Sequence, residues 1–270
     1  AVNEAVRNQL EKGVSFSLPH PLEVELAEKL VQIIPCAEMV KFGKSGSDAT
    51  SGAVRVSRAY TGKDVILYCG YHGWHDWHIG ATSRNLGVPE QVSALTHNFK
   101  YNDTEDLCDL FKKYKGEVAA VIMEPMNFFE PRDGYLQEVK DLCQQNEALL
   151  IFDETITGFR FSRGGAQELF DVIPDLATFG KVVANGFPLS IIVGRKEIME
   201  MFNDIFYSLT FGGETVSLAA GISTLKELQE KDVVGHLYRQ GEKIISFINK
   251  AVKDLDIQDN IECIGRPCFS

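Results

Sequence analysis

Short, uninterrupted apolar runs separated by helical patterns are the feature that most restricts the fold of this chain. Such runs, rich in β-branched residues, occupy positions 64–68, 118–123, 148–152 and 190–193. Apolar residues at helical spacing lie between them, at positions 104–114 and 136–146. Strands that are apolar on both faces and that alternate with helices are typical of a mainly parallel sheet covered by helices. The sequence therefore predicts an α/β fold.

The composition indicates a globular protein and argues against polyanionic partners. The 270 residues are 44% hydrophobic, which is enough for a substantial core. A formal net charge of −11 argues against a general binder of nucleic acid or of membrane surfaces, because both are polyanionic. Any phosphate that the protein binds must therefore be held by local groups.

The cysteines and the first residues indicate the cellular compartment in which the protein is expected. The six cysteines are scattered and include no C-x-x-C pair: Cys36, Cys69, Cys108, Cys143, Cys263 and Cys268. We expect reduced, mostly buried thiols, which favours the cytoplasm. No apolar stretch approaches the ~18 residues of a membrane span, and positions 1–4 lack the charged and apolar regions of a signal peptide.

Two side chains with complementary chemistry each follow a predicted strand. Lys181 ends a run that begins at Pro174, and Asp153 ends the run that begins at Ala148. Pyridoxal phosphate (PLP) needs an amine that condenses with its aldehyde and a carboxylate that keeps its pyridine nitrogen protonated. Taken singly, Lys181 fits a surface charge at a helix end, and Asp153 fits a helix cap or a metal ligand. Their joint placement favours a PLP enzyme.

A Gly/Ser turn adds a possible phosphate site. Ser45-Gly46-Ser47 follows the strand-like positions 39–42 and precedes a helix expected from Asp48 to about Tyr60. Backbone N–H groups, a hydroxyl and the positive end of the helix dipole can bind a phosphate dianion there. Most Gly/Ser turns of this kind only cap the helix, and the GxxxxGK[ST] spacing of a nucleotide P-loop is absent.

The segment after the run at 64–68 is rich in rings. Tyr71 could stack on the pyridine ring, although a buried core aromatic is the plainer interpretation. His72, His75 and His78 have HxxHxxH spacing, which in a metal-dependent hydrolase would hold a metal ion. Residues three and six apart diverge around a helix, so we prefer a ring-stacking or dimer-contact segment and predict no metal site.

Motifs along nearly the whole chain occur together in one enzyme family. They are Gly46-Ser47-Asp48-Ala49, Tyr71-His72-Gly73, Glu124-Pro125, Asp153-Glu154, Thr157-Gly158-Phe159-Arg160, Gly180-Lys181 and Thr210-Phe211-Gly212-Gly213. On these motifs the chain resembles the class III PLP-dependent aminotransferases, and among them most closely glutamate-1-semialdehyde 2,1-aminomutase and its relatives. The resemblance implies a fold-type I enzyme and a homodimer with active sites at the subunit interface.

The resemblance also implies roles for particular residues. Lys181 matches the Schiff-base lysine, and Asp153 matches the partner of the pyridine nitrogen. Gly46 and Ser47 match the phosphate turn, and Tyr71 matches the ring-stacking aromatic.

Four more positions follow from the same comparison. Thr210 matches a hydroxyl donated to the phosphate of the neighbouring subunit, and Glu124 matches an acid near the ring hydroxyl. Thr155 stands under the ring, where the family usually has an aliphatic residue. Asn127 is a weaker match to a substrate contact.

Departures from the family pattern shape the expected activity. Glu214-Thr215 replaces the common Asn-Pro, and the bulky positions 126–130 replace small residues and glycine. We therefore expect an aminotransferase that moves an amino group between an amino donor and a keto or aldehyde acceptor. One alternative is the aminomutase, whose intramolecular amino shift yields 5-aminolevulinate. An alternative of another class is a non-catalytic dimerisation module with the PLP fold.

The expected domain organisation follows from the same resemblance. Positions 1–225 are predicted to form the large PLP-binding domain with an N-terminal lead-in. Positions 226–270 are predicted to form a linking helix and the start of a truncated C-terminal small domain. Family members are longer, so we expect the chain to be part of a longer protein.

Overall fold

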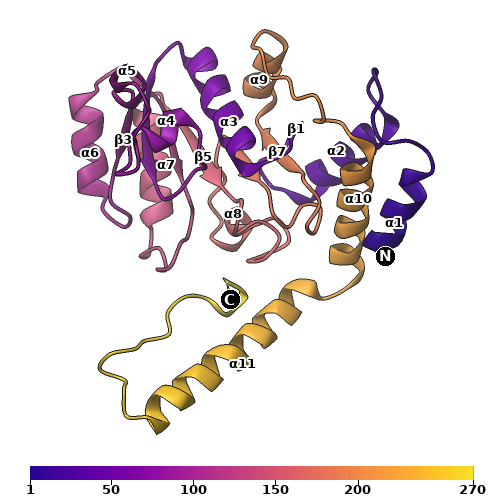
Figure 1. Cartoon of the computed structure of the whole chain (residues 1–270). Coiled ribbons are helices and arrows are strands. Elements are labelled where there is room, and N and C mark those ends of the chain that lie inside the picture. The colour runs from indigo at the N-terminus through magenta and orange to yellow at the C-terminus, as the bar shows by residue number, and fades with distance from the viewer. Residues whose placement is uncertain (270) are drawn as a thin grey trace.

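A seven-stranded mixed sheet forms the centre of the computed structural model, which describes residues 1–269 (Figure 1). Its strands are β1 (Met39–Gly43), β2 (Val65–Cys69), β3 (Thr96–Asn98), β4 (Val118–Met123), β5 (Leu149–Asp153), β6 (Leu176–Phe179) and β7 (Ser190–Gly194). They lie in the order β1-β7-β6-β5-β4-β2-β3. Strand β7 runs antiparallel to its neighbours β1 and β6, and the other pairs are parallel. The predicted α/β class with a mainly parallel sheet is confirmed.

Helices cover both faces of this sheet. They are α1 (Val2–Leu10), α2 (Pro21–Ile33), α3 (Gly46–Thr61), α4 (Asp76–Ile79), α5 (Glu90–Ser93), α6 (Thr104–Lys113), α7 (Tyr135–Gln145), α8 (Ala166–Leu169), α9 (Lys196–Met199), α10 (Thr215–Glu230) and α11 (Val233–Asp254). Short 3-10 turns occupy Glu200–Asn203 and Pro267–Phe269. Buried residues of α3 and α9 pack on one face, and those of α2, α6, α7 and α10 pack on the other.

Alternation along each strand explains why the apolar runs are continuous. In β5, Leu150 and Phe152 join the core beneath α7 and α10, whereas Leu149 and Ile151 join the core beneath α3. Successive side chains of a strand point to opposite faces, so a strand covered on both faces must be apolar at every position. The strands predicted from such runs match β2, β4, β5 and β7 to within one residue at each end.

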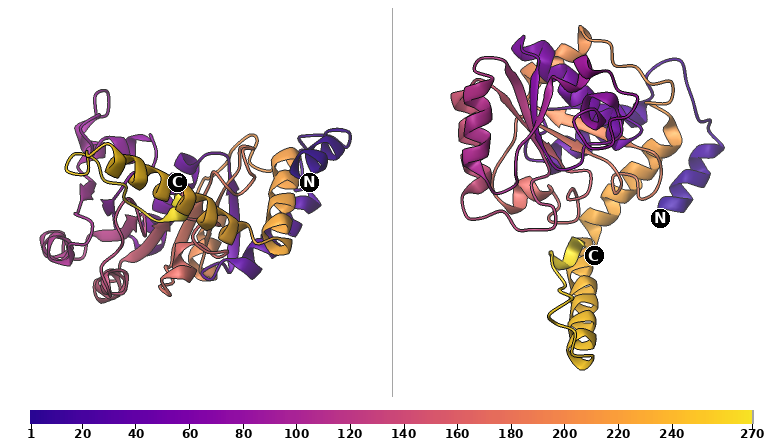
Figure 2. Two further views of the ribbon diagram at one scale, coloured as in Figure 1. Left: turned by 90° about the horizontal axis from the view of Figure 1, so that it is seen from below. Right: turned by 60° about the vertical axis from the view of Figure 1, so that its left-hand side comes forward.

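The C-terminal part of the chain leaves the body of the fold. Residues 215–254 form two helices, because Lys231 adopts an extended conformation and Asp232 caps the start of α11. Helix α10 packs against α1 and α2, whereas α11 projects away from the sheet and the helices that cover it (Figure 2). The chain then turns back, and Cys268 is buried beside Tyr238 of α11. The expected division after residue 225 stays a prediction.

Two smaller results complete the fold. Strand β3 was not predicted, because Thr96–Asn98 is short and all three of its residues are polar. Among the helices of residues 1–269, none is long and apolar enough to cross a membrane.

Candidate active site

The predicted site residues meet at one edge of the sheet, around a cavity of about 360 Å³. Its walls include Lys181, Asp153, Glu124 and Tyr71, which follow or end strands β6, β5, β4 and β2. The remaining lining residues come from the start of α3, from the segment after Tyr71, from Thr155-Ile156 and from positions 186–189. Carboxyl ends of parallel strands share one edge, which is where ligands bind in α/β sheets.

The direction of β7 adds another wall to this cavity. Because β7 is antiparallel to β6, it begins at the edge where β6 ends. The loop that enters β7, positions 186–189, therefore lies across the cavity from the β4 and β5 ends and lines it. A mixed sheet thus brings the start of one strand and the ends of four others together.

Asp153 is held by three donors at the bottom of the cavity. Its Oδ2 accepts a hydrogen bond from His72 Nδ1 at 2.9 Å, and its Oδ1 accepts from the Thr155 N–H at 3.1 Å and from Thr178 Oγ1 at 3.2 Å. His72 Nε2 faces the Cys69 carbonyl oxygen at 3.1 Å. Both ring nitrogens of His72 thus face acceptors, and only an imidazolium can donate to both.

These contacts determine the charge of the carboxylate. Burial alone would raise the pKa of Asp153, but the hydrogen bonds from His72 and Thr155 outweigh it and hold that pKa below its ordinary value of 3.8. Asp153 is therefore ionised at neutral pH. By contrast, burial raises the pKa of Glu124, whose Oε2 accepts the Tyr71 N–H at 3.3 Å. The two acids of the cavity thus differ in their affinity for a proton.

The start of α3 has the geometry of an anion site. Ser45 and Asp48 form a capping box: Ser45 Oγ accepts the Asp48 N–H at 3.1 Å, and Asp48 Oδ2 accepts the Ser45 N–H at 2.7 Å. The first N–H groups of a helix have no intrahelical acceptor, so those of Gly46 and Ser47 remain directed at the cavity end of the helix. This arrangement suits a phosphate group.

Close packing joins this turn to the segment after β2. Ser47 Oγ accepts the Trp74 N–H at 3.2 Å, and Thr50 Oγ1 donates to the His72 carbonyl oxygen at 2.7 Å. Gly73 has φ +98°, and a Cβ there would overlap Ser47. Sequence reasoning missed Thr50 and the contact of His72 with Asp153. Each contact joins residues far apart in the chain, so no local pattern in the sequence indicates it.

Lys181 has an unusual backbone for a residue other than glycine. Its φ is +39°, in the left-handed region that L-amino acids avoid. Such strain costs of order 1–3 kcal/mol and is commonly found at functional sites. Next to it, a Cβ on Gly180 or on Gly46 would come within 3.2 Å of Thr155 Cγ2. The hydroxyl of Thr155 is buried and, within residues 1–269, has no hydrogen-bond partner.

Two predicted residues lie outside the cavity. Thr210 belongs to the loop before α10 and does not line it, and Asn127 accepts the N–H of Phe129 within its own loop. The three histidines do not converge on one point: His78 Nε2 accepts the His72 N–H at 3.2 Å, whereas His75 Nδ1 is 2.7 Å from Ser51 Oγ. In the described part of the chain, no group of three metal-ligating side chains has the geometry to hold an ion.

Comparison with known proteins gives this fold and site a family. The sequence profile described as aminotransferase class-III matches residues 1–266, and the chain belongs to that family. Glutamate-1-semialdehyde 2,1-aminomutase of Francisella tularensis subsp. holarctica is 38% identical over 283 residues, which cover 98% of this chain and 65% of that protein.

Solved structures agree with the family. The FumI protein of Sphingopyxis sp. MTA144, solved in a PLP form, aligns with a TM-score of 0.89 at 29% identity, over 94% of this chain and 62% of that one. An omega-transaminase from Sphaerobacter thermophilus aligns with a TM-score of 0.85 at 28% identity, over 94% and 64%. The chain thus has the fold of the fold-type I PLP transaminases and spans about 65% of the length of its curated relatives.

The family and its PLP-bound structures indicate pyridoxal 5'-phosphate as the cofactor. The residues present fit this group. Gly46 and Gly180 leave room beside Thr155 that a Cβ would fill, and the start of α3 offers N–H groups to a phosphate. An amine and an ionised carboxylate line the same cavity.

Proposed function

We propose that the protein catalyses PLP-dependent transfer of an amino group from a small amino donor to a keto or aldehyde acceptor. One observation carries the proposal: Lys181 and Asp153, from neighbouring strands, line a single cavity together with the first turn of α3. When bound, PLP supplies an aldehyde that bonds to amines and a ring that accepts electrons from the substrate carbon.

In this proposal, residues of the chain bind the cofactor, fix the charge of its ring and transfer the proton. Lys181 Nζ would hold the cofactor and, as a free amine, would take a proton from the substrate carbon and deliver it to the former aldehyde carbon of the cofactor. Asp153, ionised and fixed by His72, accepts the hydrogen bond of the protonated ring nitrogen. Gly46 and Ser47 bind the phosphate with backbone N–H groups.

The other predicted residues take supporting roles. Tyr71 stacks on the ring, Thr155 packs beneath it, and Glu124, which lines the cavity, orients the ring hydroxyl. Thr210 donates its hydroxyl to the phosphate of a neighbouring subunit, which agrees with its position outside this cavity. Asn127 is proposed only as a substrate contact.

A titration with PLP tests the proposal. We expect the wild-type chain to give the absorbance band of a covalently bound cofactor and, after borohydride reduction, a PLP mass on the peptide that contains Lys181. Lys181→Ala should lose both signals, whereas Lys196→Ala, which removes an exposed lysine of α9, should keep them. Equal signals in both variants would contradict the proposal, and no signal in the wild type would favour the non-catalytic module.

The aminomutase is a second candidate, and the curated relatives at 38% identity favour it. The two reactions use the same lysine and carboxylate, so the site does not separate them. The loop at 126–130, bulkier than the aminomutase pattern, leads us to prefer the aminotransferase. Glutamate-1-semialdehyde supplied without a second carbonyl compound distinguishes them, because only the aminomutase converts it efficiently to 5-aminolevulinate.

We also propose a homodimer with shared active sites, and the division into a large domain over 1–225 and a linking segment over 226–270. Exposed aromatic side chains beside the cavity, among them Tyr71 and Trp74, support the dimer because such residues are enriched in interfaces. The projecting α11 supports the linking segment.

A further inference from the structure

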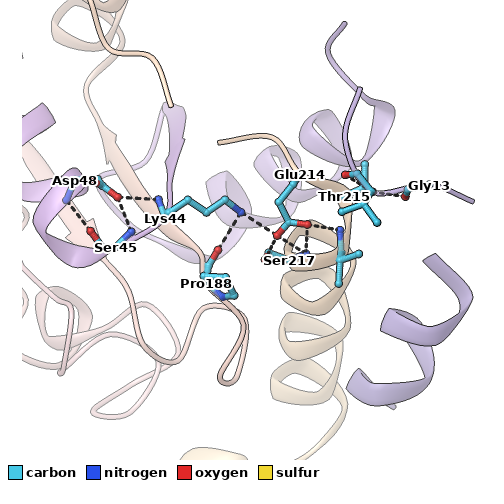
Figure 3. Close-up of polar contacts among 10 residues, drawn as sticks. Gly13, Lys44, Ser45, Asp48, Pro188, Glu214, Thr215 and Ser217 are labelled. Carbon is cyan, nitrogen blue, oxygen red and sulfur yellow. Dashed lines mark hydrogen bonds and ion pairs between the residues drawn. The ribbon is translucent and has the colours of Figure 1, made fainter. Parts of the chain in front are cut away.

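Lys44, the residue before the Ser45-Gly46-Ser47 turn, forms an ion pair that the family resemblance does not explain. Its Nζ donates to Glu214 Oε1 at 2.9 Å and to the Pro188 carbonyl oxygen at 3.0 Å (Figure 3). The side chains of Lys44 and Glu214 are only 16% and 11% exposed. Lys44 and Pro188 both line the cavity, whereas Glu214 lies behind them at the start of α10.

Glu214 is fixed by contacts of its own. Its carboxylate accepts the N–H groups of Val216 at 2.9 Å and of Ser217 at 3.1 Å, so it caps α10. Burial alone would raise the pKa of Glu214, but hydrogen bonds from Ser217 and Lys44 hold that pKa below its ordinary value. The carboxylate that receives Lys44 is therefore charged at neutral pH and rigidly placed.

The neighbouring threonine extends this network to the N-terminal segment. Thr215 Oγ1 donates to the carbonyl oxygens of Gly13 at 2.8 Å and of Val14 at 3.1 Å (Figure 3). Glu214-Thr215 is the pair that stands where the family usually has Asn-Pro. The substituted pair thus connects α10 to the segment after α1 on one side and to Lys44 on the other.

Lys44 connects the Ser45-Gly46-Ser47 turn to the loop that enters β7. Its backbone N–H donates to Asp48 Oδ2 at 3.3 Å within the capping box, and its ammonium holds the loop that enters β7 through Pro188. Ion pairs at the surface contribute little because water screens them, but this pair is shielded and its geometry is set by fixed partners. A shift of Lys44 would move the first turn of α3 relative to the opposite wall.

We propose that Lys44 and Glu214 are positioning residues for an aromatic ligand that carries a phosphate: Glu214 holds the Lys44 ammonium at the cavity wall, where it fixes the α3 turn and offsets the dianion. The inference rests on the proposed function and adds two residues to that site. Asp48 and Glu214 place two carboxylates near a turn that would receive an anion, so the Lys44 ammonium is needed to offset their repulsion of that anion.

Comparison of PLP with pyridoxal tests the inference, because pyridoxal keeps the ring and the aldehyde but lacks the phosphate. With the full chain, Lys44→Met and Glu214→Gln should each weaken PLP binding by about tenfold or more and leave pyridoxal binding within about twofold. Lys44→Arg should restore much of the PLP affinity, since it keeps the charge. The double variant should lose no more than either single variant, because both act through one contact.

Matched controls and contrary outcomes follow from the same measurement. Lys196→Met breaks an exposed pair with Glu200 at 3.7 Å and should leave both affinities unchanged. Unchanged PLP affinity in Lys44→Met, or an equal loss of PLP and pyridoxal binding, would overturn the inference while leaving the proposed function intact. A wild-type chain that binds neither compound would instead overturn both.

Discussion

At the scale of single residues, the charge of the candidate site depends on Asp153 and His72. A buried carboxylate by itself would tend to be neutral, and a neutral acid could not hold a protonated ring nitrogen. Three hydrogen bonds, from His72, Thr155 and Thr178, keep Asp153 ionised. The pair places a carboxylate of defined charge at the end of β5.

Asp153→Asn should lower the free energy of unfolding at neutral pH by about 3 kcal/mol, because the buried donors of His72, Thr155 and Thr178 lose a charged acceptor. The pKa of Asp153 is lower in the folded chain than its ordinary value of 3.8, so its stabilisation is present above that pH and is lost as the pH falls through the lowered pKa. Urea unfolding should therefore show a difference from wild type that shrinks below pH 3.8.

Asp109→Asn is the matched control, because Asp109 pairs with Lys112 on an exposed helix face. It should change the free energy of unfolding by less than about 0.5 kcal/mol. If the difference in free energy of unfolding between Asp153→Asn and wild type did not depend on pH, Asp153 would not have the lowered pKa described above.

At the scale of elements, the loop after β4 is attached to the C-terminal segment. Arg266 Nε lies 2.7 Å from Glu130 Oε1, and the rings of Phe128 and Phe269 meet with centroids 6.2 Å apart. Gly241 of α11 permits this return, because a Cβ there would overlap the Pro267 carbonyl group. The loop that departs most from the family pattern is thus held by the segment that follows α11.

Gly241→Val should release positions 265–269 from α11, since the added side chain occupies the space of Pro267. We expect faster alkylation of Cys268, whose free thiol is buried in the wild type, while the sheet and its helices keep their protection. Ser246→Val serves as the control, because position 246 is exposed on the same helix. Equal alkylation rates of Cys268 in the two variants would show that Gly241 does not hold the segment.

The elements also show where prediction from sequence succeeds and where it stops. Buried strands were predictable, because β4 and β5 must be apolar at every position to pack on both faces. Strand β3 was missed because hydrogen bonds to β2, rather than an apolar run, define it. The break between α10 and α11 was missed because Lys231 and Asp232 do not interrupt a helical pattern as glycine or proline would.

At the scale of the whole molecule, the cavity opens beside side chains that are costly to expose. Tyr71 is 61% exposed, Trp74 is 69% exposed and Phe211, next to Thr210, is 59% exposed. Large exposed aromatic residues commonly act as anchors in interfaces. They agree with the proposal that a second copy of the chain covers this side and contributes Thr210.

Phe211→Asp should weaken the proposed dimer by about tenfold or more, because a charge replaces an aromatic anchor. Sedimentation equilibrium over a range of concentrations measures the effect. Phe247→Asp removes a still more exposed ring on α11 and should leave association unchanged. A wild-type chain that stays monomeric at every concentration would refute the dimer.

The sequence by itself determined the class of fold and placed an amine and an acid at strand ends, because a strand buried on both faces and a charged residue at its end leave a local pattern. Lys181 and Asp153 were predictable for this reason. Tertiary structure alone decided that His72 faces Asp153, that Thr50 ties the α3 turn to the segment after β2, and that Lys44 meets Glu214. These contacts join residues far apart in the chain, so their partners are chosen by the packing of the sheet edge and not by any spacing along the sequence.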